Sequence, residues 1–178
     1  VSFKNVEIYS IDEYYPAPAD NYSRNRRLYE ELVAKVDIAK ENVHAPKLTE
    51  VHDSAYVTEF CAKYDEMASG LDLLIMGTGE KGQIGFNEFA ANEISRTRTV
   101  MLPYTSRKRQ AKNFGGNMEA TPDKAIAMGI STMMSAKKIH LIAWGEDKAQ
   151  IVKQIVEGPI NPACPASLLQ KHSNISFY

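Results

Sequence analysis

The chain has 178 residues, a size typical of a single domain. Its 44% hydrophobic and 24% charged residues are ordinary for a globular protein and exclude a disordered, collagen-like or low-complexity chain. The formal net charge of -1 excludes a whole-surface binder of nucleic acid or of anionic membranes, which would be far more basic. No apolar run approaches the roughly 18 residues that a membrane helix needs, so we expect a cytoplasmic protein. From the length, we expect a single domain over residues 1–178.

The first third of the chain predicts one strand and two helices. Val6–Ile11 alternates apolar and polar residues, which indicates a strand that ends directly before Asp12. Ser23 is a candidate N-cap for a helix whose apolar face is formed by the i, i+3, i+4, i+7 spacing within residues 29–36. The same spacing within residues 57–64 predicts the second helix.

The rest of the chain alternates short strands with short helices. Leu71–Met76 is almost wholly apolar and is followed by glycines, which is typical of a buried parallel strand. Further strands are predicted over residues 98–102, 125–128, 139–144 and 174–178, and helices over 104–113, 130–135, 147–157 and 166–171. This alternation predicts an α/β fold with a parallel sheet, in which ligands bind at the carboxyl ends of the strands.

A glycine-rich loop follows the strand at Leu71–Met76. Gly77-Thr78-Gly79-Glu80-Lys81-Gly82 matches G-x-G-x-x-G, a dinucleotide-binding pattern. That pattern also requires a helix opening on the last glycine and an acidic residue at the end of the next strand, and the sequence has neither. We therefore predict no dinucleotide cofactor. Two interpretations stay open: a tight strand-exit turn, or a loop whose Gly77, Gly79 and Gly82 let a ligand approach the backbone.

The charges are unevenly distributed. No acidic residue lies between Glu93 and Glu119, while the same stretch holds six cations: Arg96, Arg98, Arg107, Lys108, Arg109 and Lys112. This local cationic stretch has two interpretations, a solvated helix face or a site that binds phosphate through charge-assisted hydrogen bonds. The two cysteines and four histidines have no metal-ligand spacing, so no metal site is predicted.

In this order along the chain, four segments resemble the glucosamine-6-phosphate deaminase family: Ser10–Tyr14, Leu71–Ala90, Ser95–Arg98 and Val156–Gly158. The resemblance implies conversion of glucosamine 6-phosphate to fructose 6-phosphate and ammonia. It also implies a three-layer, modified Rossmann-type fold with a mostly parallel sheet flanked by helices. The related 6-phosphogluconolactonases share the fold and the glycine-rich loop but lack the Gly85–Glu88 pattern, which favours the deaminase branch.

The resemblance also implies roles for individual residues. Asp12 matches the general base that moves a proton between C1 and C2 of the opened sugar, and partial burial would raise its pKa towards neutrality. From the residues alone, a turn-capping aspartate is the favoured interpretation of Asp12, and the resemblance favours the base instead. Glu88 matches a glutamate that supports a ring-opening histidine. Lys148 matches a phosphate-binding lysine at the start of a helix, and Lys112 replaces an arginine that binds the same phosphate.

The chain departs from the family pattern inside the glycine-rich loop. Gln83 replaces the ring-opening histidine, and a glutamine amide cannot exchange protons near pH 7. Lys81 stands where the family commonly has an acid or an amide, and we expect it to form an ion pair with Glu88. Phe89 replaces the family's usual proline.

Three functions follow from these residues. The first is an amino-sugar phosphate deaminase in which ring opening is slow or left to solution. The second is a non-catalytic binder of sugar phosphates, and the third is a lactonase or isomerase acting on another sugar phosphate. Each function has a small-molecule sugar phosphate as its partner. We expect neither a nucleic-acid partner nor a membrane partner, and a homo-oligomer is possible.

Family members have a further phosphate-binding loop before the segment matched by Val1 and continue past Tyr178. We therefore expect a chain incomplete at both ends, or a shortened relative.

Overall fold

The structure is a computed structural model, and it describes residues 1–88 and 91–178. The chain forms two compact units: Val1–Glu59 with Thr99–Ala127, and Phe60–Arg98 with Met128–Tyr178. Strands alternate with helices along the chain, which confirms the predicted α/β class. The helix α2 (Ser54–Met67) contains residues of both units.

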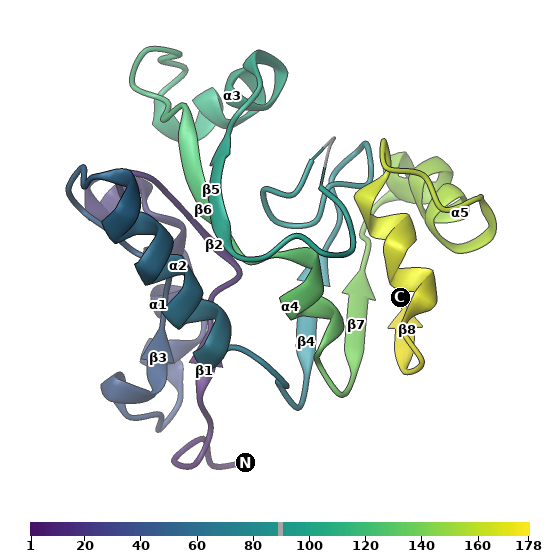
Figure 1. Cartoon of the computed structure of the whole chain (residues 1–178), viewed down its shortest axis with the longest axis horizontal. Helices are drawn as coiled ribbons and strands as arrows, with labels where there is room; N and C mark the ends of the chain where they lie inside the picture. The colour runs from purple at the N-terminus through teal and green to yellow at the C-terminus, as the bar shows by residue number, and fades with distance from the viewer. Residues whose placement is uncertain (89–90) are drawn as a thin grey trace. The chain divides into compact units, whose positions relative to one another are not determined.

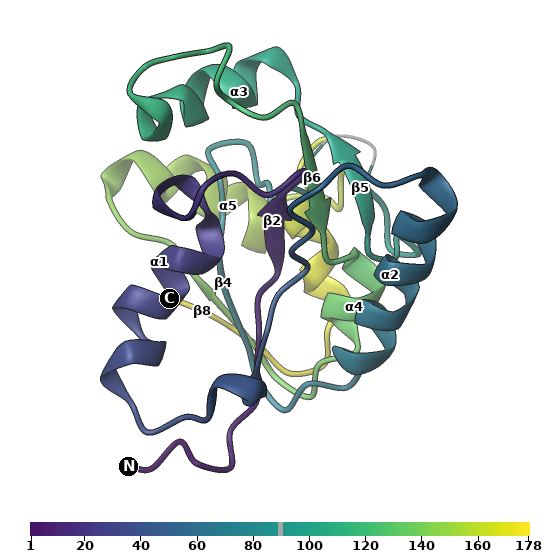
Figure 2. The same cartoon turned by 90° about the vertical axis from the view of Figure 1, so that its left-hand side faces the viewer.

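The first unit contains two small sheets. Strand β1 (Ile8–Tyr9) pairs in parallel with β3 (Val43–His44). Strand β2 (Asp12–Tyr14) pairs antiparallel with β6 (Lys124–Ala127). Strand β5 (Arg98–Met101), whose first residue belongs to the second unit, lies on the other side of β6. Figure 2 shows β2, β6 and β5 side by side. The antiparallel pair was not expected, because an alternating pattern predicts a strand but not the direction of its neighbour.

The single strand predicted over Val6–Ile11 is wrong in its bounds, because the chain bends after Tyr9. The backbone N–H of Ser10 donates to the carbonyl oxygen of His44 at 2.9 Å, and the Ser10 hydroxyl donates to the carbonyl oxygen of Asp12 at 3.2 Å. Ser10 therefore still contacts the partner strand of β1, and the bend at Ile11 separates β1 from β2. Asp12 is therefore the first residue of a strand, rather than the residue after one.

Short helices complete the first unit. They are η1 (Asp20–Tyr22), α1 (Arg24–Glu31), η2 (Val33–Lys35), η3 (Lys40–Asn42), α3 (Tyr104–Gln110) and η4 (Ala111–Phe114). Helix α1 begins directly after Ser23, as predicted. It ends earlier than the apolar spacing indicated, because the backbone at Leu32 leaves the helical region at φ -128°.

The second unit is built on a parallel sheet. Strands β4 (Leu74–Gly77), β7 (Ile139–Ile142) and β8 (Ile175–Phe177) pair in parallel in that order, as Figure 1 shows. The helices of this unit are α4 (Ile130–Met134), η5 (Glu146–Lys148), α5 (Ala149–Glu157) and η6 (Pro165–Lys171). These elements lie within or close to the predicted ranges.

Strand β4 is parallel, as predicted, but it is buried on one face only. Leu74 and Met76 are 3% and 4% exposed, whereas Ile75 between them is 58% exposed. Successive side chains of a strand point to opposite faces, so one face of β4 packs in the core and the other carries exposed apolar side chains. A run of apolar residues in the sequence does not distinguish these two arrangements.

Gly129 allows α4 to approach the segment before β5. A Cβ atom at this position would lie less than 3.0 Å from backbone atoms of Ser95 and Arg96. We expect Gly129→Ala to lower the free energy of unfolding by about 2 kcal/mol, because backbone cannot move aside as a flexible side chain can. Urea unfolding measures this effect.

Gly77→Ala is the matched control for that variant. A Cβ atom at Gly77 would lie 3.5 Å from the carbonyl oxygen of Ile142, which is an ordinary contact. This control should change the free energy of unfolding by less than about 0.5 kcal/mol. Equal unfolding midpoints for the two variants would contradict the close packing at Gly129.

Candidate active site

A buried ion pair connects β2 with α1 in the first unit. Asp12 is 2% exposed, and the Nε atom of Arg24 donates to its Oδ1 atom at 2.5 Å. The Arg24 side chain is 38% exposed, so its outer part reaches solvent. The other oxygen of Asp12, Oδ2, is buried and accepts no hydrogen bond from the described residues. One carboxylate oxygen is therefore held, while the second is unpartnered.

Opposing effects determine the protonation of this carboxylate. Burial raises the pKa of Asp12 above its usual range, while the charge and the hydrogen bond of Arg24 lower it. The negative charge of Asp12 in turn raises the pKa of Arg24. A raised pKa is what we expected of Asp12, since it would suit a general base, and the role itself stays a prediction. The turn-capping alternative does not fit, because Asp12 lies in a strand and its side chain accepts from Arg24.

The neighbouring carboxylate has a structural role. Glu13 is fully buried, and its oxygens accept the backbone N–H groups of Tyr14, Arg24 and Asn25 at 2.8, 3.2 and 3.0 Å. They also accept the side-chain amide of Asn25 at 2.7 Å and the hydroxyl of Ser23 at 2.5 Å. Glu13 thus accepts hydrogen bonds from the backbone N–H groups at the N-terminus of α1, where the helix dipole favours a negative charge. Ser23 lies at the predicted N-cap, but its hydroxyl donates to Glu13 rather than capping the helix itself.

The strand that carries Asp12 also holds the segment that carries Lys112. The Tyr14 hydroxyl donates to Oε1 of Gln110 at 3.1 Å, and the Tyr14 ring lies edge-to-face with Phe114 at 5.4 Å. These two contacts flank Lys112, which lies exposed on η4. The candidate base and one candidate phosphate ligand therefore belong to one packed unit.

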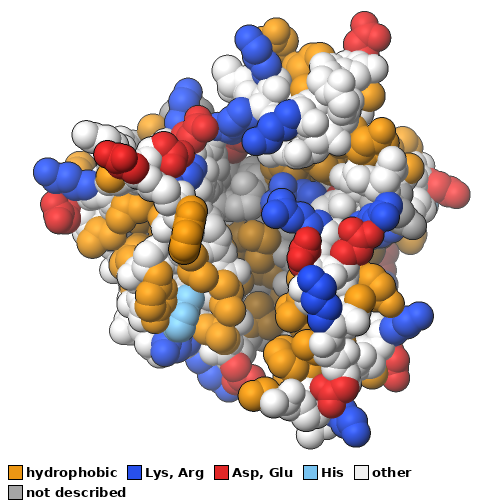
Figure 3. Space-filling model, turned by 180° about the vertical axis from the view of Figure 1, so that it is seen from behind, with side chains coloured by type: hydrophobic (Ala, Val, Ile, Leu, Met, Phe, Trp, Pro, Cys, Tyr) orange, Lys and Arg blue, Asp and Glu red, His pale blue; other side chains and the backbone are white. Residues whose placement is uncertain are grey.

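The cationic stretch is divided between the two units. Arg96 and Arg98 belong to the second unit, and their side chains donate to buried side chains there. Arg107 belongs to the first unit and donates to two backbone carbonyls at 3.1 and 3.0 Å. These bonds give the three arginines structural roles and leave the phosphate interpretation to exposed cations such as Lys112. Figure 3 shows that Lys and Arg are interspersed with Asp and Glu on the face it presents.

The glycine-rich loop of the second unit closes on itself. The backbone N–H of Gly79 donates to the carbonyl oxygen of Gln83 at 2.8 Å, and the N–H of Gly82 donates to that of Gly79 at 3.0 Å. The side chain of Gln83 is buried, and its Oε1 atom accepts the N–H of Lys81 at 2.9 Å. A Cβ atom on Gly79 would overlap this side chain, so Gln83 fills the inside of the loop.

Gly82 is required for packing as well as for its backbone conformation. Its φ of +74° favours glycine, and a Cβ atom there would overlap the Cys164 sulfur. Together with Gly79, it therefore approaches atoms of the protein, which supports the tight-turn interpretation. Glu88 is half-buried just after this loop and Lys81 is exposed, and their ion pair stays a prediction. Phe89 lies outside the described residues.

Asn87 is a residue whose role the sequence analysis missed. It is fully buried, and its Nδ2 atom donates to the carbonyl oxygens of Ile84 and Met128 at 3.1 and 2.8 Å. Its Oδ1 atom accepts Nη1 of Arg98 at 3.1 Å. Asn87 thus fixes the chain after the loop. Little in the sequence signals this role, because Asn87 lies in a mixed stretch beside Glu88, and only its burial shows that its amide must be hydrogen-bonded.

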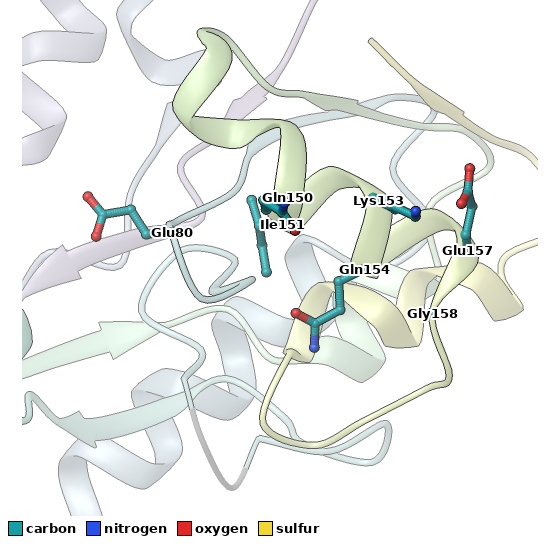
Figure 4. Close-up of a pocket in the computed structure, with 7 residues that line it drawn as sticks. All are labelled: Glu80, Gln150, Ile151, Lys153, Gln154, Glu157 and Gly158. Carbon is teal, nitrogen blue, oxygen red and sulfur yellow. The ribbon is translucent and has the colours of Figure 1, made fainter.

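Lys148 is the last residue of η5 and the N-cap of α5, which is the expected start of a helix, and its phosphate-binding role stays a prediction. A hollow of about 430 Å³ lies beside the same helix (Figure 4). Its lining residues are Glu80, Gln150, Ile151, Lys153, Gln154, Glu157 and Gly158. Lys148 is not among them, and the mixed charges of the lining favour no particular ligand.

Within residues 1–88 and 91–178, no group of three or more His, Cys, Asp or Glu side chains lies close enough together to bind a metal ion. In the same ranges, each helix is too short or too polar to cross a bilayer.

Comparison with known proteins places these features in a family. The family model for glucosamine-6-phosphate isomerases/6-phosphogluconolactonase matches residues 1–177. A glucosamine-6-phosphate deaminase-like protein of Bacteroides thetaiotaomicron is 42% identical over 98% of this chain and 26% of its own length. The glucosamine-6-phosphate deaminase of Beutenbergia cavernae is 37% identical over 99% of this chain and 67% of its own length. The chain thus spans about a quarter of one relative and two thirds of the other.

Solved structures agree with the sequence comparison. A monomeric glucosamine-6-phosphate deaminase superposes with a TM-score of 0.89 at 29% identity, over 99% of this chain and 73% of that protein. The 6-phosphogluconolactonase of Thermotoga maritima has a TM-score of 0.72 at 17% identity, over 99% of this chain and 74% of that protein, a likeness of fold alone. The α/β fold, the match over residues 1–177 and the deaminase relatives agree, and the chain belongs to the glucosamine-6-phosphate isomerase/6-phosphogluconolactonase family.

Proposed function

We propose that the chain acts as a glucosamine-6-phosphate deaminase, converting glucosamine 6-phosphate and water to fructose 6-phosphate and ammonia. The observation that carries the proposal is the carboxylate of Asp12, which is buried, held at Oδ1 by Arg24 and unpartnered at Oδ2. The deaminase relatives support the choice of substrate class. A cytoplasmic location and a homo-oligomer stay predictions.

The proposed chemistry moves one proton between adjacent carbons. In the open-chain sugar, the C2–H bond is acidic because it adjoins the C1 aldehyde, and Asp12 accepts this proton. The C–H electron pair forms a C1–C2 double bond, the π pair of the C1–O1 double bond moves to O1, and O1 gains a proton from solvent. Asp12 then returns its proton to C1, which leaves an iminium at C2. Water hydrolyses the iminium to the ketone, ammonia and one proton released to solvent, and Asp12 is again a carboxylate.

Ring opening is the step for which Gln83 offers no exchangeable proton. The Oε1 atom of Gln83 accepts the N–H of Lys81, and an amide does not exchange protons near neutral pH. We therefore propose that the open-chain sugar forms in solution. Lys112 and Lys148 are each proposed as phosphate ligands, since a lysine ammonium neutralises phosphate charge.

The loss of a ring-opening group also favours a second candidate function, a non-catalytic binder of sugar phosphates. The two functions predict different results when the chain is mixed with glucosamine 6-phosphate. The deaminase releases ammonia and fructose 6-phosphate, and its rate stops rising with protein concentration once ring opening in solution becomes limiting. The binder gives heat on titration in a calorimeter but releases no ammonia. The absence of both binding heat and ammonia release would exclude both functions.

A further inference from the structure

Arg24 is the charged side chain in direct contact with Asp12. Its Nε atom reaches Oδ1 at 2.5 Å from the first turn of α1, and that turn is itself held by Glu13. The ion pair therefore does not depend on a freely moving side chain. Fixing the carboxylate in this way leaves the buried Oδ2 atom as the oxygen that can exchange a proton.

The other groups around Asp12 do not supply a second positive charge. Glu13 and Tyr14 follow on the same strand, and the negative charge of Glu13 raises the pKa of Asp12. From β6, Ala127 lies opposite Asp12 in the strand register, and it carries no charge. In the described part of the chain, the positive charge that acts on this carboxylate is therefore that of Arg24.

We propose that Arg24 is a positioning residue for the reaction: it holds Oδ1, favours the ionised form of the buried carboxylate and assigns proton transfer to Oδ2. The inference rests on the proposed function, because it describes how the proposed base is prepared. Burial alone would favour the protonated carboxyl, which cannot act as a base. The guanidinium opposes that effect, since an opposite charge within about 4–6 Å favours the ionised form.

The test measures the protonation of Asp12 directly. The full chain is labelled with 13C at aspartate carboxyl carbons, the Asp12 signal is assigned by its loss in Asp12→Asn, and the signal is titrated. In Arg24→Gln we expect the pKa of Asp12 to rise by about one pH unit or more. Arg24→Lys keeps the positive charge but loses the Nε hydrogen bond, so the pKa of Asp12 should rise less than in Arg24→Gln. This second variant still tests the proposal if Arg24→Gln does not fold.

Arg27→Gln is the matched control, because Arg27 is exposed on the same helix and its loss changes the net charge equally. It should leave the Asp12 titration unchanged. An unchanged Asp12 titration in both Arg24 variants, or an equal rise in Arg27→Gln, overturns the role of Arg24.

A second readout separates this inference from the proposed function. The acid limb of kcat/KM for ammonia release should move to higher pH in Arg24→Gln and stay in place in Arg27→Gln. If the wild-type chain releases no ammonia, the proposed function fails. The 13C titration of Asp12 would then still show whether Arg24 favours the ionised form of the Asp12 carboxylate.

Discussion

Asp12→Asn is expected to lower the rate of ammonia release from glucosamine 6-phosphate by about 10²–10⁴-fold, the range that a positioned general base contributes. Asparagine keeps the shape of the side chain, and its amide oxygen can still accept from Nε of Arg24. The nitrogen that replaces Oδ2 cannot accept a proton from C2. The rate should therefore fall while binding of the sugar phosphate, measured by calorimetry, changes little.

Asp123→Asn is the control for this variant. Asp123 belongs to the same unit, is exposed, and takes part in the fold through its carbonyl oxygen, which accepts the N–H of Leu102. The same chemical change there should leave the rate within about twofold of wild type. Equal rates in wild type and Asp12→Asn, whether high or at background, would contradict the role of Asp12.

Asp65→Asn is expected to lower the free energy of unfolding by about 3 kcal/mol. Asp65 is 1% exposed and receives hydrogen bonds from two other segments of the second unit. Its oxygens accept the N–H of Thr97 at 3.1 Å and the Thr132 hydroxyl at 2.5 Å, and a further bond comes from the Thr97 hydroxyl. An asparagine would turn an NH₂ group towards these donors and leave at least one of them unpaired.

The ion pair with Arg96 contributes less to this effect. Nε of Arg96 lies 2.7 Å from Oδ2 of Asp65, but the Arg96 side chain is 64% exposed, and solvent screens such pairs. Most of the decrease in the free energy of unfolding should therefore come from losing the hydrogen bonds with the two threonine hydroxyls and the Thr97 N–H. Urea unfolding at pH 7 measures this decrease, and Asp72→Asn is the control. Asp72 pairs with Lys137 on the surface, so its replacement should leave the unfolding midpoint unchanged.

The same residue predicts a dependence on pH. Burial raises the pKa of Asp65, but hydrogen bonds from Thr132, Thr97 and Arg96 outweigh it, so the pKa is lowered overall. The stabilisation is therefore fully present above the unfolded pKa of about 3.9 and is lost as the pH falls through the lower, folded pKa. The stability of Asp65→Asn should lack this loss. Parallel acid limbs for the two proteins would contradict the assignment.

The sequence predicts those parts of the fold that depend on periodicity along one element. Apolar spacing placed α2 and α5, and the apolar run at Leu71–Met76 placed β4 and its parallel direction. It did not predict the break at Ser10 or the antiparallel pairing of β2, because a pattern of two or three residues identifies no partner.

The site was predicted less completely than the fold. The resemblance indicated Asp12, but no pattern in the sequence singled out Arg24. Its pairing with Asp12 depends on where α1 begins relative to β2, which no local pattern encodes. Asp65 lies within α2 next to the buried Tyr64, and its partners come from segments 31 to 67 residues away. Sequence spacing shows a helix face but not the donors that face it.

The alternation of Asp12 and Glu13 along β2 also constrains how this protein can change in evolution. Neighbouring residues of a strand point to opposite faces, so one carboxylate reaches Arg24 while the next holds the N-terminus of α1. A one-residue insertion between Tyr9 and Asp12 would move Asp12 into the position of Glu13 and leave no carboxylate beside Arg24. A one-residue deletion would put Glu13 beside Arg24 and Tyr14 beneath the helix, so either change removes one of the two carboxylate contacts. We therefore expect natural variation in this region to consist of substitutions, with length changes confined to loops further along the chain.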